Sequence, residues 1–249
     1  MYVLESLFRW IHVVAGILWI GLLYFFNFVN SGFAPTMDAE TKKKVVPELM
    51  PRALFFFRWG AAYTWVTGVL LLMLVYYHTS MVFADGQPNW RLPALAMIAL
   101  VFLAPFIYDV LVKTVLTEPK VQFGAGVVLA TVVVFLLEYV GGFGYRGYAI
   151  HLGTMFGTIM AFNVWFRIWP AQRQIITATK NGQAPDPALV ALAGTRSRHN
   201  TYMSVPLVFT MISQHAFWAA SPIWMAVIVL VGWSLVYHLY SRAAQVKGF

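Results

Sequence analysis

Residues 92–115 read LPALAMIALVFLAPFIYDVLVKTV, an apolar stretch in which the first charged side chain is Asp109. An α-helix rises about 1.5 Å per residue, so a stretch of this length can cross a hydrocarbon core of roughly 30 Å. Apolar and polar side chains do not alternate along it, which excludes a strand of a membrane β-barrel. The stretch therefore predicts a transmembrane α-helix.

Six further stretches have a similar length and composition. The whole chain of 249 residues is 60% hydrophobic and only 10% charged, which is too apolar for a water-soluble domain of this size. We therefore predict an all-α integral membrane protein whose single domain, 1–249, is a bundle of seven transmembrane helices. The predicted spans lie near 7–29, 55–77, 92–115, 121–140, 148–169, 202–219 and 223–241.

The lysines and arginines beside these spans predict the orientation. Fourteen of them fall on one side of the predicted membrane and three on the other, so the positive-inside rule places the N-terminus outside and the C-terminus in the cytoplasm. The net charge of +8 thus reflects topology and attraction to anionic inner-leaflet lipid, and no nucleic-acid partner is expected. The inner set is Lys42, Lys43, Lys44, Arg52, Arg58, Lys113, Lys120, Arg167, Arg173, Lys180, Arg196, Arg198, Arg242 and Lys247; the outer set is Arg9, Arg91 and Arg146.

Two polar stretches, 30–54 and 170–201, are predicted to be cytoplasmic loops. The first contains Pro47 and Pro51 and is expected to hold only a short helix. In the second, Pro170 is expected to stop the preceding helix, and the turn signals at 181–187 divide the loop before an amphipathic stretch. Two local pairings inside the spans are also predicted: an ion pair between Asp109 and Lys113, and an interhelical hydrogen bond from Asn163.

The histidines are the strongest indication of function. The chain has no cysteine, which excludes disulfides, thiolate metal sites, iron–sulfur clusters and covalently attached c-type haem. On the predicted topology His12, His78, His151 and His215 come from four different spans and lie at a similar depth near the outer face. Imidazole is a common ligand of haem iron and of transition metals, and a polar ring inside a membrane commonly marks a site.

Three of these rings, His12, His151 and His215, lie among apolar neighbours and are predicted to be haem ligands or to line the haem pocket. His78 is a weaker metal-ligand candidate, because an imidazole at the headgroup level is commonly an interfacial residue. The favoured cofactor is haem b held by two histidines, one from the first span and one from the fifth or sixth. A copper or dinuclear site with three or four imidazoles is the less favoured alternative.

Small residues accompany two of the histidines. Gly16 follows His12 by one helical turn, and Gly153 and Gly157 form a G-x-x-x-G pair just after His151. Such glycines make room either for a porphyrin or for the close approach of another helix, and for the G-x-x-x-G pair helix packing is the commoner role.

A polar cluster precedes the sixth predicted span. Arg196, Arg198, His199 and Asn200 bring together cationic and amide donors that can bind a planar anion or a phosphate group. The alternative is that these residues only supply juxtamembrane positive charge.

Several segments resemble the membrane domain of the cytochrome-linked urate oxidases, also called urate hydroxylases. They are RWIHVVAGILWIG at 9–21, HLGTMFGTIMAFN at 151–163, RSRHNTY at 196–202 and SQH at 213–215. The resemblance covers most of the chain and is specific in its second half. It implies a multi-pass protein of the bacterial cytoplasmic membrane that oxidises urate to 5-hydroxyisourate and passes electrons to a c-type cytochrome.

One departure from that family bears on the expected partner. Its members often continue into an eighth span and an external cytochrome c domain, whereas this sequence ends at Phe249 without a cysteine. We therefore expect a separate periplasmic or membrane-bound c-type cytochrome, or a larger membrane complex, to accept the electrons. The alternative is a non-catalytic electron-transfer or accessory subunit of a respiratory-type membrane complex.

Overall fold

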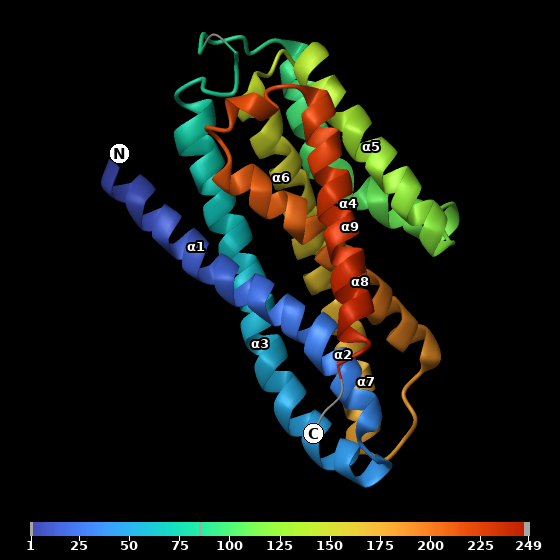
Figure 1. Cartoon of the computed structure of the whole chain (residues 1–249). Helices are drawn as coiled ribbons and strands as arrows, with labels where there is room; N and C mark the ends of the chain where they lie inside the picture. The colour runs from blue at the N-terminus through green and yellow to red at the C-terminus, as the bar shows by residue number, and fades with distance from the viewer. Residues whose placement is uncertain (1, 85, 247–249) are drawn as a thin grey trace. The chain divides into compact units, whose positions relative to one another are not determined.

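The computed structural model describes residues 2–84 and 86–246 (Figure 1). These residues are almost wholly helical and contain no β-strand; their one β-type pairing is an isolated bridge between Phe83 and Phe143. The all-helical class predicted from the sequence is thus confirmed. Lys247, counted above with the inner-side charges, lies outside the described residues.

The helices run in the following order. The α-helices are α1 (Tyr2–Tyr24), α2 (Ser31–Phe33), α3 (Ala39–Leu71), α4 (Leu92–Thr114), α5 (Pro119–Tyr139), α6 (Tyr145–Asn163), α7 (Trp169–Lys180), α8 (Pro187–Ile212) and α9 (Pro222–Ala243). The π-helical segments are η1 (Phe25–Asn30), η3 (Leu72–Tyr77) and η4 (Val164–Ile168), and the 3₁₀ segments are η2 (Ala34–Thr36) and η5 (Phe217–Ala219).

Six helical stretches among the described residues are long and apolar enough to cross a membrane. Many large side chains exposed along them are apolar, including Ile17, Leu103 and Phe106, as a surface in contact with lipid requires. These features indicate a multi-pass membrane protein, while the number of spans and their orientation stay predictions. The six stretches are Tyr2–Thr36, Ala39–Tyr77, Leu92–Thr114, Pro119–Tyr139, Tyr145–Lys180 and Pro222–Ala243.

The predicted span at 202–219 differs from the structure at its end. It falls in α8, which begins well before it, at Pro187, and ends at Ile212. Two side chains of α6 bind carbonyl groups just beyond that end: the Tyr145 hydroxyl donates to the Ser213 carbonyl at 2.7 Å, and Arg146 Nε donates to the Gln214 carbonyl at 3.2 Å. These bonds satisfy carbonyl groups that a continuing helix would otherwise have paired.

The stretch 30–54, predicted to be mostly a loop, is largely helical, because α3 begins at Ala39. The Asp38 carboxylate accepts hydrogen bonds from the Thr41 backbone N–H at 2.8 Å and the Thr41 hydroxyl at 2.9 Å. Ion pairs one turn apart then support the exposed face, for example Lys44 with Glu40 at 2.7 Å. The helix continues through Pro47 and Pro51, so it is longer than the short helix that was expected in this stretch.

The stretch 170–201 is also helical, and the expected stop at Pro170 is wrong. The helix passes from α6 through the π segment η4 into α7, so Pro170 lies inside a continuous helical stretch, just after the π segment. The turn predicted after α7 is confirmed: Gly182 has a φ of +70°, and the Asp186 carboxylate accepts the Ala188 N–H at 2.8 Å at the start of α8.

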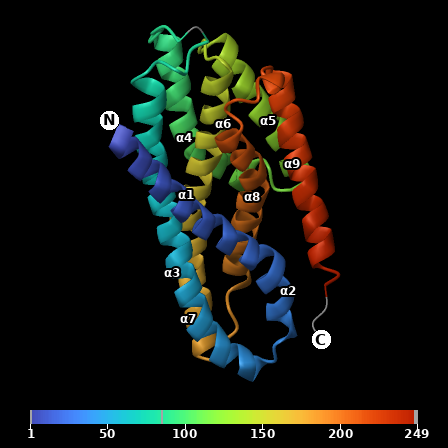
Figure 2. The same cartoon turned by 60° about the vertical axis from the view of Figure 1, so that its left-hand side comes forward.

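The chain divides into two compact units. The first unit comprises Met1–Phe8, Gly68–Ile159 and Met203–Ser234, and the second comprises Arg9–Thr67, Met160–Tyr202 and Leu235–Phe249. In the first unit α4 packs against α5, and the predicted ion pair forms, with Lys113 Nζ 2.8 Å from Asp109 Oδ2. In the second unit α1 crosses α3 (Figure 2), and Gly60 of α3 lies so close to α1 that a Cβ atom there would be 3.3 Å from the Ala15 carbonyl oxygen.

Candidate functional site

His12 lies on α1 in the second unit, half-buried against α3. Its Nδ1 lies 2.9 Å from the Thr64 carbonyl oxygen and 3.3 Å from Thr67 Oγ1. A carbonyl only accepts hydrogen bonds, so the proton is on Nδ1 and the lone pair is on Nε2. Gly16 leaves moderate space beside it, because a Cβ atom there would meet only Thr64, at 3.8 Å or more. A histidine whose other nitrogen donates to a carbonyl is a common arrangement for a metal ligand.

His151 lies on α6 in the first unit and is fully buried. Its Nδ1–H donates to the Gly147 carbonyl at 2.7 Å, and its Nε2 accepts a hydrogen bond of 2.9 Å from the Tyr77 hydroxyl. The Phe143 ring stacks on the imidazole with the ring centroids 4.6 Å apart. Both nitrogens of His151 are therefore engaged within the protein, and η3 is the segment that positions Tyr77.

The two remaining histidines of the predicted outer layer are exposed. His78 follows η3, and His215 lies in the turn after α8 rather than inside a helix. Within either unit, the described residues contain no group of three or more histidine, aspartate or glutamate side chains that could hold a metal ion. The copper or dinuclear alternative thus gains no support from either unit.

The glycines after His151 lie against α8. A Cβ atom at Gly153 would come within 2.2 Å of Thr210 Oγ1, and one at Gly157 would lie 3.5 Å from Leu207 Cδ1. The G-x-x-x-G pair therefore serves the close packing of α6 and α8 in the first unit, the commoner of the two roles considered for it.

The predicted polar cluster at 196–200 is mostly internal to the second unit. Arg196 and Asn200 are buried, His199 is half-buried and Arg198 is exposed. Asn163 Nδ2 donates to Asn200 Oδ1 at 2.9 Å, which confirms the interhelical hydrogen bond predicted for Asn163. The pKa of His199 is lowered to about 4, mainly by burial and to a smaller extent by the positive charges of Arg196 and Arg198.

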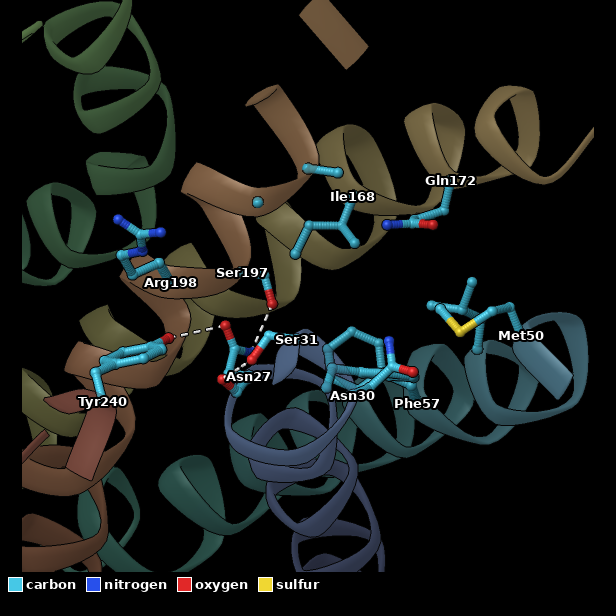
Figure 3. Close-up of a pocket in the computed structure, with 14 residues that line it drawn as sticks. Asn27, Asn30, Ser31, Met50, Phe57, Ile168, Gln172, Ser197, Arg198 and Tyr240 are labelled. Carbon is cyan, nitrogen blue, oxygen red and sulfur yellow. Dashed lines mark hydrogen bonds between the residues drawn. The ribbon is translucent and has the colours of Figure 1, made fainter. Parts of the chain in front are cut away.

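A cavity of about 260 Å³ in the second unit was not predicted (Figure 3). Segment η1 lines one wall, α7 and α8 line another, and Arg198 is the only residue of the predicted cluster that reaches it. The sequence carried one indication of this site, because FFNFVN at 25–30 places two asparagines in an otherwise apolar span. The lining residues are Phe26, Asn27, Asn30, Ser31, Met50, Leu54, Phe57, Ile168, Gln172, Ala193, Gly194, Ser197, Arg198 and Tyr240.

The side-chain amide of Asn27 organises the wall of this cavity. Its Nδ2 donates to the Leu23 carbonyl and to Ser197 Oγ, each at 2.8 Å, and its Oδ1 accepts a hydrogen bond of 2.8 Å from the Tyr240 hydroxyl. All of its hydrogen-bonding groups are used within the protein, so Asn27 holds three segments of the chain together around the cavity.

Long apolar helices, two differently bonded imidazoles and a small polar cavity together define an integral membrane protein with candidate ligand sites in its helices. The sequence matches the family described as Urate oxidase N-terminal over residues 1–247, so the chain belongs to this family. Comparisons with curated proteins and with solved structures found no match.

Proposed function

We propose that this chain is a membrane oxidoreductase subunit that oxidises urate to 5-hydroxyisourate and passes the electrons to a separate c-type cytochrome. The observation that carries the proposal is the family match over nearly the whole chain. In this reaction urate gains the elements of one water molecule and loses two protons and two electrons. The two electrons reduce two ferric cytochromes, one electron each.

The proposal includes a haem b held by two histidine side chains. His12 would be one ligand, because the Thr64 carbonyl accepts its Nδ1–H and leaves the Nε2 lone pair available. His215 would be available as a second ligand, because its ring makes no hydrogen bond within the described part of the chain, whereas His151 would be available only after the Tyr77 hydroxyl has left its Nε2. When bound, such a haem supplies a one-electron carrier between substrate and cytochrome.

The spectrum of the purified protein tests this proposal. We expect a reduced-minus-oxidised difference spectrum of haem b, a pyridine haemochrome, and reduction of the bound haem and of added ferric cytochrome c when urate is supplied without oxygen. A haem that dithionite reduces but urate does not would favour the accessory electron-transfer subunit instead. Urate-dependent cytochrome reduction by protein without any haem would overturn the cofactor assignment, whereas the proposed reaction would stand.

A further inference from the structure

We propose that the cavity of the second unit is the substrate site and that it takes a small planar anion with adjacent ring amide groups, the urate type of heterocycle. The identity of the ligand rests on the proposed function, whereas binding to the cavity can be tested independently of the reaction. The cavity has a small volume and apolar walls, and the side-chain amides of Asn30 and Gln172 and the guanidinium of Arg198 line it (Figure 3).

The size and the walls of the cavity favour a compact ring. A volume of about 260 Å³ lies just under the range of roughly 300–1,000 Å³ that holds drug-sized ligands. A ligand smaller than a drug molecule therefore suits it, and a porphyrin does not. The buried side chains of Leu54, Phe57 and Ile168 provide apolar surface against which a flat heterocycle can pack.

Two amide side chains supply the polar contacts. Asn30 of η1 and Gln172 of α7 both line the cavity, are half-buried and make no side-chain hydrogen bond among the described residues. Figure 3 shows both amides on the Met50 side of the cavity. Each amide can donate and accept at once, which matches the alternating N–H and C=O groups of a ring amide. A ligand bound here satisfies both groups.

The charge of the cavity selects an anion. Among the described residues that line it, Arg198 is the one charged side chain, and none is a carboxylate. Its guanidinium lies over the Tyr240 ring, 5.8 Å from the centroid, and makes no ion pair with any residue that the structure describes. Figure 3 places Arg198 on the Tyr240 side, away from the two amides. It therefore raises the local positive potential at one end of the cavity, which favours a monoanion over a neutral heterocycle.

Equilibrium dialysis of labelled urate against the purified full-length chain tests the site. Asn30→Leu and Gln172→Met remove one amide each at similar volume, and we expect each to raise the Kd about tenfold, the effect of losing a hydrogen bond to an anion. Arg198→Gln should raise the Kd and reduce its dependence on salt. The control is Gln174→Met on the same helix, because Gln174 is exposed and does not line this cavity; its Kd should stay unchanged.

The outcomes separate this proposal from the proposed function. Competition by xanthine but not by benzoate supports recognition of ring amides, whereas equal competition by benzoate would overturn it. If the wild-type chain oxidises urate but the Kd is unchanged in both amide variants, the cavity is not the substrate site, and the proposed reaction stands. If urate binding depends on the amides but no urate is oxidised, the cavity is a urate site, and the proposed reaction is wrong. Melting curves of the variants confirm that they fold.

Discussion

Two histidines with similar sequence contexts have different chemistry in the two units. His12 and His151 each lie in an apolar span with a glycine nearby, and each donates its Nδ1–H to a backbone carbonyl. At His151 the Tyr77 hydroxyl occupies Nε2, whereas the lone pair of His12 Nε2 has no hydrogen-bond partner among the described residues. The depth of a histidine in a span thus predicts that its ring needs a partner, but not whether the partner is a metal or a neighbouring side chain.

The first prediction, which has the largest effect, concerns His12. His12→Ala should reduce the haem bound per protein more than tenfold, because it removes an imidazole whose Nε2 would be available to hold the group. The measurement is the pyridine haemochrome of purified protein. His238→Ala is the matched control, since His238 is an exposed histidine on α9. Equal haem content in both variants would remove His12 from the ligand set.

The second prediction concerns His151 and its hydroxyl partner. Tyr77→Phe leaves Nε2 of a fully buried imidazole without a partner, so the free energy of unfolding should fall by about 1–3 kcal/mol. A double-mutant cycle with His151→Leu, followed by thermal or chemical unfolding in detergent, isolates the pair. Additive losses would show that the hydrogen bond adds no stability. A rise in bound haem in Tyr77→Phe would instead identify His151 as a ligand that Tyr77 blocks.

The third prediction concerns Gly153 and Gly157, whose alanine variants should differ in stability by a smaller amount. Gly153→Ala places a Cβ atom within 2.2 Å of Thr210 Oγ1 and should cost about 1–2 kcal/mol of stability, because Thr210 must move. Gly157→Ala, with 3.5 Å to its nearest neighbour, should be neutral or slightly stabilising. Melting temperatures of the two variants test this. If Gly157→Ala alone lowers haem content without affecting stability, that glycine borders a porphyrin rather than a helix.

Long apolar runs were sufficient to predict most of the helices, because burial in lipid demands that backbone groups bond within one segment. Two predictions in the polar stretches were wrong: the helix continues past Pro170, which was expected to stop it, and the stretch that contains Pro47 was expected to be mostly a loop. Capping and ion pairs support the helix at Pro47, and a π segment precedes Pro170. Such support depends on several residues acting together and is not visible in a single residue type.

The candidate sites were only partly predictable. His12 and Arg198 were singled out from the sequence, but Asn30, Gln172 and the role of Tyr77 were not. Tyr77 stands 74 residues before its partner His151, and a pairing over such a distance leaves no local pattern. The two asparagines of η1 were the one available indication, since polar groups in a span commonly have a function.

His199 is a third histidine to compare with His12 and His151. It is kept neutral by burial beside two arginines. Its pKa is lowered to about 4 in the folded protein, against about 6.5 in the unfolded chain. Below pH 6.5 the unfolded chain binds a proton that the folded protein does not, so stability falls as the pH drops toward 4. We expect a loss on the order of 1 kcal/mol by pH 5.5, measured as the fall in unfolding free energy from pH 7.5. His199→Gln should remove this part of the pH dependence, while His238→Ala should retain it. An unchanged slope in His199→Gln would show that the ring is protonated as readily in the folded protein as in water, and that the adjacent arginines do not act on it.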